Sequence, residues 1–289
     1  MNSRFINFKK LLLITMPLGE EFLFLALIFG TLIGCVSSIV GLGGGILVIP
    51  CSIFIFGFPP NTAIVISLFY MTCLTISASI RYMKMKLVNY RLAMLYNLFD
   101  IPGVVLGGLL TVVIVGNVLA GISGFIIIFL SILLFCKKDN SCKNILKSNE
   151  ISDNTNFREN NSKLGVENPL LASFSSFSGG MITGLVGLGG GTTDTTSMIL
   201  LGLDVKKAAA TSEFAMASTS FFGIIIHLLI GSYTHSWLWP FIMAIGGIIG
   251  AQLGPIVSKN IKSSFVRKGL AGLAFYSGIL MILLMFGIV

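Results

Sequence analysis

Ten apolar segments, five on each side of a polar stretch, are the feature that most constrains this chain. By residue number they are 22–41, 46–57, 62–80, 91–114 and 117–135, followed by 169–187, 193–203, 207–230, 237–257 and 266–288. Several approach or exceed the roughly 20 residues that a helix needs to cross a bilayer. Only 10% of the residues are charged, whereas soluble domains carry about a quarter. The sequence therefore predicts an all-α polytopic membrane protein.

The two sets of segments look like copies of each other. The pentapeptide GLGGG at 41–45 recurs at 187–191. Further matches follow at a nearly constant offset: Ser67 with Ser212, and Met71 with Met216. An ordered series of matches of this kind indicates an internal duplication.

The duplication divides the chain into four regions. The stretch 137–168 is rich in Asn, Ser and charge, and its composition cannot bury enough apolar area to fold alone. The N-terminal basic residues and short apolar run lack a small-residue cleavage site, which favours an interfacial lead-in over a cleaved signal peptide. We expect a lead-in at 1–20, a first transmembrane repeat at 21–136, a cytoplasmic linker at 137–168 and a second repeat at 169–289.

Basic residues between the segments predict the topology. They are Arg81, Lys84, Lys86, Arg91, Lys137, Lys138, Lys206, Lys207, Lys259, Lys262, Arg267 and Lys268. Placing them in the cytoplasm of a multi-pass cell-membrane protein requires an external N-terminus, and five passes per half then invert the second repeat. The exceptions to this rule are Arg4, Lys9 and Lys10. The net charge of +8 indicates attraction to anionic lipid rather than to nucleic acid.

The second segment of each half is short. Twelve helical residues reach about 18 Å, against about 30 Å of hydrocarbon. The first two segments of each half therefore either form a re-entrant hairpin with a glycine triplet at its tip or cross fully. Broken helices at corresponding places in two inverted halves point to the binding site of a transporter.

The motifs around the triplets resemble a known family. GLGGGILVIP followed by FGFPPNTAIVIS, and a second GLGGG followed by AAATS, are similar to the sulfite exporter TauE/SafE family of membrane permeases. The resemblance covers nearly the whole chain outside the N-terminus and the linker. It implies movement of sulfur-containing anions such as sulfite or sulfonates. The chain departs from the family pattern at Ile66, at Thr196 in place of a proline, and at the TTD of 192–194.

The glycine triplets are candidate anion sites. A helix break exposes backbone N–H groups, and the following helix start adds partial positive charge that suits an oxyanion. The alternative is tight helix crossing, which does not call for three glycines in a row. No Lys follows either triplet, which excludes a Walker A loop. The candidate substrate-binding glycines are Gly43, Gly44, Gly45, Gly189, Gly190 and Gly191.

Other glycines follow a packing pattern instead. The spacing of four residues in Gly103 and Gly107, and in Gly246, Gly250 and Gly254, places small residues on one helix face. Such faces let helices approach closely in membranes.

Hydroxyl side chains extend the candidate binding set. Ser67, Thr211 and Ser212 lie one to two turns into the third segment of each half, where they could donate to an anion. The alternative is hydrogen bonding back to the helix backbone. Thr192 and Thr193, beside the second triplet, complete the set.

Three acids lie within apolar segments, where ionisable groups are costly and often carry protons. Asp194 follows the second triplet and Glu213 follows Thr211 and Ser212, so we expect both to flank one cavity. We assign Asp194, Glu213 and Asp100 to proton coupling or gating. The alternative for Asp194 is a helix N-cap, and that for Asp100 is pairing with hydroxyls or with backbone freed by a kink. His227 is interpreted as interfacial.

These features predict a transporter that exports a small anion by alternating access, with proton coupling through the buried acids as a hypothesis. A passive anion channel and an importer of a carboxylate or sulfur anion are the alternatives. The expected partners are the substrate, the bilayer and protons, without nucleic acid. We expect no enzymatic activity, no cofactor and no metal, and the oligomeric state is left open.

Overall fold

The computed structural model describes residues 20–40, 43–114, 116–136, 169–200, 203, 205–233, 237–257 and 263–287. The predicted lead-in up to residue 19 and the linker at 137–168 lie outside these ranges. The expectations for those two regions stay predictions.

The described chain is helical, with ten helices and no strand in the ranges given above. They are α2 (Glu20–Val40), α3 (Gly45–Phe54), α4 (Pro60–Lys84), α5 (Tyr90–Leu110), α6 (Gly116–Cys136), α8 (Pro169–Val186), α9 (Gly191–Leu200), α10 (Val205–Leu229), α11 (Leu238–Val257) and α12 (Ser263–Met285). Each helix corresponds to one apolar segment of the sequence. The all-α prediction is confirmed.

Length and composition suit several helices to a bilayer. Three candidate spans are long enough to cross one, at Pro60–Lys84, Tyr90–Leu110 and Lys207–Leu229. Shorter apolar stretches occupy Leu23–Ser38, Gly45–Phe54, Gly116–Ile132, Leu238–Leu253 and Ala271–Met285. Large apolar side chains on the outward faces are exposed, including Phe24, Leu98, Phe125, Phe129 and Phe174. Such a surface is unfavourable in water and matches a lipid environment.

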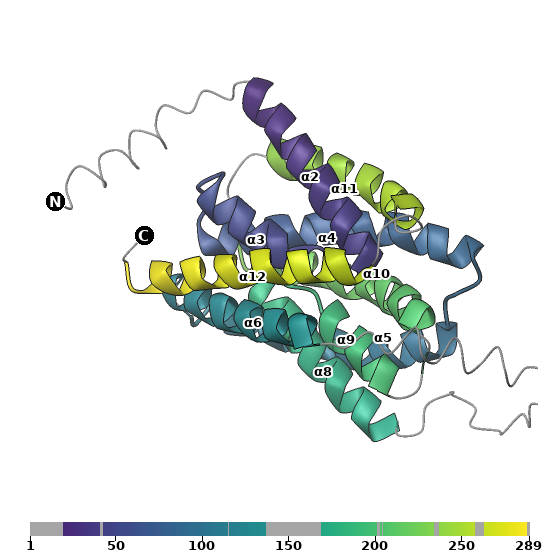
Figure 1. Ribbon diagram of the computed structural model, residues 1–289. Helices are drawn as coiled ribbons and strands as arrows, with labels where there is room; N and C mark the ends of the chain where they lie inside the picture. Colours follow the sequence, from purple (N-terminus) through teal and green to yellow (C-terminus); the bar gives the residue numbers. More distant parts are fainter. Residues whose placement is uncertain are drawn as a thin grey trace, which may run out of the picture.

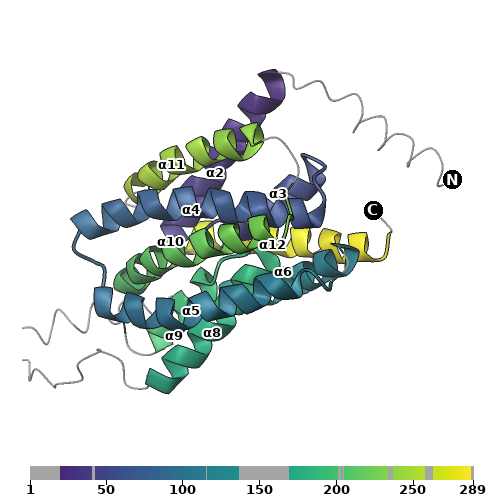
Figure 2. The same cartoon turned by 180° about the vertical axis from the view of Figure 1, so that it is seen from behind.

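Helices of one half pack on helices of the other. Helix α2 lies along α11, and α8 lies along α5, as both views show (Figures 1 and 2). Helix α4 packs on α10, and α6 on α12. Exchanging the first five helices for the last five, in order, turns the α2–α11 pair into the α8–α5 pair and leaves the α4–α10 and α6–α12 pairs unchanged. This pattern is what a two-fold relation between the halves would produce, and the inverted orientation in the membrane stays a prediction.

Glycines allow the two exchanged helix pairs to cross closely. A Cβ on Gly34 of α2 would lie 2.7 Å from the Gly247 carbonyl oxygen of α11. On the other side, Gly184 of α8 packs directly on the Val104 carbonyl of α5. The glycines assigned to packing from their spacing also meet backbone of the facing helix: Gly103, Gly107, Gly246 and Gly250. The packing prediction is confirmed for these four, and the surroundings of Gly254 lie outside the described residues.

Candidate functional site

Helices α3 and α9 are the short helices that follow the glycine triplets. Each has ten residues and begins at the third glycine, Gly45 or Gly191. Gly43 and Gly44 have φ of 69° and 86°, and Gly189 has φ of 79°. Only glycine adopts this left-handed region without strain. The breaks predicted from sequence are therefore present, and ten residues reach about 15 Å.

The two breaks meet between the central helices. A Cβ on Gly43 would lie 2.9 Å from the Met216 sulfur and 3.3 Å from the Met71 methyl carbon. A Cβ on Gly189 would meet the same Met71 methyl and would lie 3.5 Å from the Met216 sulfur. One methionine comes from α4 and the other from α10. Both triplets therefore close on the same pair of side chains, and the N-termini of α3 and α9 converge there.

The hydroxyls of the central helices bond to backbone carbonyls. Ser67 Oγ donates to the Gly187 carbonyl at 2.7 Å, which links α4 to the second triplet. Ser212 Oγ donates to the Gly191 carbonyl at 3.4 Å, and Thr193 Oγ1 to the Gly190 carbonyl at 2.6 Å. These three hydroxyls lie at the breaks, and each donates its proton to a backbone carbonyl of the protein.

Thr211 is oriented differently. Its hydroxyl donates to the Lys207 carbonyl at 2.6 Å and accepts from the Asn89 backbone N–H at 3.1 Å. These bonds serve the α10 backbone and the start of α5. The side chain of Thr192 lies outside the described residues.

The acids form two groups. Asp194 of α9 and Asp100 of α5 are 0% and 1% exposed. They are neighbours, because Gly179 of α8 packs on the Asp194 carboxyl and the adjacent Gly180 packs on the Asp100 backbone, and the two carboxyls interact. Neither oxygen of Asp194 has a donor among the described residues, so this carboxyl does not cap α9. Asp194 thus lies beside Asp100, which the sequence does not indicate, and the expectation that Asp194 and Glu213 flank one cavity stays a prediction.

Glu213 lies at the first triplet instead. It is fully buried on α10, and the Gly43 backbone N–H approaches its carboxyl, although neither oxygen has a donor in hydrogen-bond geometry within the described chain. Two tyrosines of α4 are near this carboxyl, Tyr70 and Tyr82. Their hydroxyls donate to carbonyls of α2.

Several buried polar residues are missed or misassigned by sequence reasoning. The interfacial interpretation of His227 is wrong, because this residue is 1% exposed and its Nε2 lies 2.8 Å from the Gly184 carbonyl oxygen. Ser176 and Ser197 contact the Asp100–Asp194 region. The hydroxyl-rich start of α8 is the available signal for Ser176. Nothing in the local sequence marks His227 as buried.

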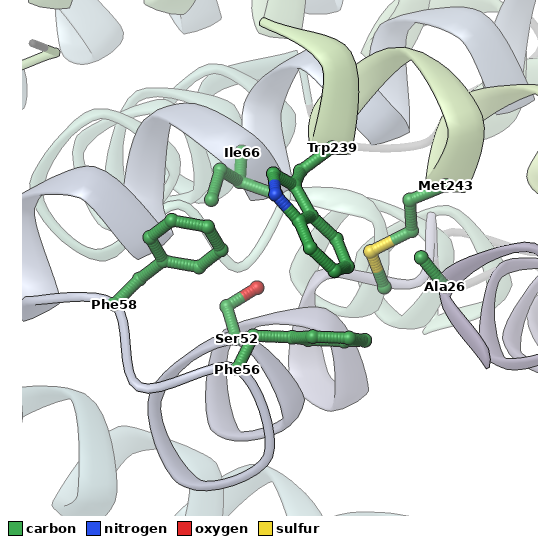
Figure 3. Close-up of a pocket in the computed structure, with 7 residues that line it drawn as sticks. All are labelled: Ala26, Ser52, Phe56, Phe58, Ile66, Trp239 and Met243. Carbon is green, nitrogen blue, oxygen red and sulfur yellow. The ribbon is translucent and has the colours of Figure 1, made fainter. Parts of the chain in front are cut away.

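A small pocket lies beside α3, away from the triplets. It is lined by Ala26, Ser52, Phe56, Phe58, Ile66, Trp239 and Met243. Figure 3 shows the Ser52 hydroxyl pointing into the space between the aromatic rings, and this oxygen has no partner among the described residues. The rings of Phe56 and Trp239 are in contact, with centroids 5.3 Å apart. The pocket offers one unpaired hydroxyl in an aromatic and apolar wall.

An apolar all-helical bundle, in which two broken helices meet between central helices beside buried acids, has the architecture of a membrane transporter. The sequence matches the family model described as "Sulfite exporter TauE/SafE" over residues 26–281, and the chain belongs to this family. The family resemblance noted from the motifs is confirmed.

Two curated relatives are named as transporters. The chain is 26% identical to the "Probable membrane transporter protein YunE" of Bacillus subtilis over 254 residues, which cover 83% of this chain and 89% of the relative. It is 27% identical to the "Probable membrane transporter protein MJ0441" of Methanocaldococcus jannaschii over 274 residues, covering 90% and 95%. No solved structure matches the chain significantly. The protein is therefore a membrane transporter, and its family gives no indication of an enzyme.

Proposed function

We propose that the protein is a permease that exports sulfite, an organosulfonate or a related sulfur-containing anion by alternating access. The observation that carries the proposal is the convergence of both glycine triplets on Met71 and Met216. The family description supports the substrate class.

The converging helix starts supply the chemistry for an anion. The first backbone N–H groups of a helix have no partner within the helix, and they carry partial positive charge. The start of α3 at Gly45 lies against the turn that precedes the start of α9, because a Cβ on Gly45 would be only 2.6 Å from the Gly187 carbonyl oxygen. Two helix starts can hold an oxyanion without the desolvation cost of a buried lysine or arginine.

The asymmetry of the two halves supports alternating access. On the α3 side the pocket beside Ser52 provides space. On the α9 side the residues at the corresponding place, including Tyr96 and Met198, belong to a buried apolar cluster. Under the predicted inverted topology, the two sides of the centre then differ in structure, as the two sides of an alternating-access transporter do in any one state.

The test is binding of candidate anions to the purified chain. Sulfite, sulfoacetate and taurine should raise the melting temperature, whereas acetate and succinate should not. Gly43→Ala places a methyl against Met216 and strains a backbone with φ of 69°, so it should abolish the shift. The matched control is Gly57→Ala, which has the same strain at φ of 70° but meets nothing within 4 Å. A response to carboxylates alone would contradict the substrate class.

Transport measurements distinguish an exporting permease from a passive channel and from an importer. In liposomes, a coupled permease accumulates labelled sulfoacetate against its electrochemical gradient, and a channel does not. A tag in the 137–168 linker reports which way the chain is inserted in the liposome. The direction of transport relative to that orientation then distinguishes export from import.

A further inference from the structure

We propose that Asp100 and Asp194 form a proton-binding site at which the two carboxyls share protons, next to the second glycine triplet. The proposal deepens the proposed function by naming the coupling ion and its residues. Only its coupling role rests on that function, because proton binding by the pair does not require a substrate.

Asp100 is on α5 and Asp194 is on α9, and α8 packs on both of these helices (Figure 2). Both side chains are at most 1% exposed. Glycine backbone covers the Asp194 carboxyl on two sides, since a Cβ on Gly179 would lie 2.9 Å from its Oδ1 and one on Gly190 would lie 3.1 Å from its Oδ2. Two ionised carboxylates in contact repel strongly in such a medium. At least one of them must therefore be neutral.

No cation faces the pair from the described parts of the neighbouring helices. Helix α8 carries no titratable side chain, and the nearest titratable group on α5 is the Tyr96 phenol. On α10, Lys207 is exposed, Glu213 is near Gly43, and His227 bonds to the Gly184 carbonyl. The charge of the pair is thus balanced by protons.

The donors and acceptors around Asp100 lead to the same conclusion, that at least one carboxyl is protonated. Ser176 Oγ lies 2.6 Å from the Tyr96 carbonyl oxygen and 2.9 Å from Asp100 Oδ1. A hydroxyl donates one proton, and a carbonyl only accepts. When Ser176 donates to the carbonyl, its contact with Asp100 needs a proton on Asp100, and the contact between the two carboxyls needs another. The network of Ser176, Asp100 and Asp194 therefore contains at least one carboxyl proton and has places for two.

The neighbouring hydroxyls do not supply these protons. Ser197 Oγ donates to the Asp194 backbone carbonyl at 3.0 Å, and the Tyr96 hydroxyl then donates to Ser197 Oγ at 2.6 Å. Both protons are used within this second chain. The carboxyl of Asp194 consequently receives no hydrogen bond from another group of the described residues, and Asp100 is the carboxyl that interacts with it.

The repeat-related positions, one in each half of the chain, are an internal control. Asp194 is the third residue after its glycine triplet, where the first half has Val48, and Asp100 is the third residue before Gly103, where the second half has Met243 before Gly246. Val48 and Met243 are both buried in one apolar cluster. The architecture therefore accepts an apolar pair at this place, so the acids are not needed for packing.

The geometry suits a proton better than a metal ion. Calcium and magnesium take about six or more oxygen ligands, whereas the site offers two carboxyls and one hydroxyl between glycine backbones. The described residues contain no group of three His, Cys, Asp or Glu side chains that could hold a metal. A proton bridges two carboxyls without needing further space.

Infrared spectroscopy on the purified full-length protein tests the site without any substrate. At neutral pH the wild type should show the carbonyl stretch of a protonated, buried carboxylic acid, which shifts in D₂O and disappears on alkaline titration. Asp100→Met combined with Asp194→Val copies the repeat-related pair Met243 and Val48 and should remove this titrating band while retaining the helical content. Asp194→Asn, which keeps a donor facing Asp100, should also remove it.

Glu213→Gln is the comparison for the second buried acid, and it should leave the Asp band in place. A wild type without the band, or a band that survives both Asp variants, overturns the proposal. Stabilisation of the wild type by sodium or calcium, absent in the double variant, would also overturn it by showing a cation site. In liposomes, an imposed pH gradient should drive uptake of labelled sulfoacetate by the wild type and not by Asp194→Asn. If only the proposed substrate is wrong, this transport result fails while the infrared result still holds.

Discussion

Replacing Ser67 with alanine tests whether hydrogen bonds to the glycine breaks hold the two halves together. The Ser67 hydroxyl is fully buried and donates to the Gly187 carbonyl, 120 residues along the chain, at 2.7 Å. No backbone N–H of the described turns and loops bonds to this carbonyl. The substitution therefore removes its donor and leaves a buried acceptor unpaired.

The magnitude follows from the membrane setting. Hydrogen bonds between helices in membrane proteins contribute about 0.6 kcal/mol on average and up to about 1.7 kcal/mol. The Ser67 bond belongs near the upper end, because it is short, fully buried and without a substitute donor. We expect the free energy of unfolding to fall by about 1.5 kcal/mol, which is roughly a tenfold change in the unfolding equilibrium.

Ser123→Ala is the matched control. Ser123 is also a buried serine whose hydroxyl donates at 2.7 Å, but its acceptor is the Leu119 carbonyl, one turn back in its own helix. That carbonyl retains its helical partner when the hydroxyl is removed, so the expected loss is under about 0.5 kcal/mol. Reversible unfolding in mixed micelles, followed by tryptophan fluorescence, measures both values. Equal losses in the two variants would refute the idea that the break depends on the Ser67 bond.

Three further predictions address other contacts. Tyr70→Phe removes the hydroxyl that donates to the Gly30 carbonyl at 2.7 Å, and the same unfolding assay should show a loss of about 1 kcal/mol; an unchanged midpoint would contradict this. Gly184→Ala puts a methyl against the Val104 carbonyl and should cost about 1–3 kcal/mol through overpacking, which a melting temperature equal to that of the wild type would disprove. Glu213→Gln removes an acid beside the Gly43 N–H, so sulfoacetate should bind more tightly than to the wild type at alkaline pH, where the ionised acid would repel the anion, and weaker binding by calorimetry would show that the acid assists the anion.

The helices and their breaks could be predicted because they depend on local composition. In lipid, an apolar stretch must satisfy its backbone N–H and C=O groups with hydrogen bonds within the segment, so it forms a helix whatever its neighbours are. Glycines with positive φ end or begin helices by their own conformational freedom, so the triplets that contain Gly43 and Gly189 indicate the breaks by residue type alone. The repeated motifs also carried the family assignment.

The grouping of the acids could not be predicted in this way. The motifs predict that Asp194 and Glu213 flank one cavity, and they give no indication that Asp100 lies beside Asp194. The structure places α9 between α8 and α10 and lays α8 along α5, which brings Asp194 to Asp100 and leaves Glu213 at the other triplet.

The sequence by itself thus determined the helical segments, the paired breaks, the duplication and the set of unusual acids. Only the tertiary structure decided which acids share a site, that both breaks close on Met71 and Met216, and that Ser176 and His227 are buried. The physical reason is that helix formation in a bilayer is a property of each segment. The neighbours of a buried side chain depend instead on which helix faces fit closely, and glycines far apart in the chain decide that fit.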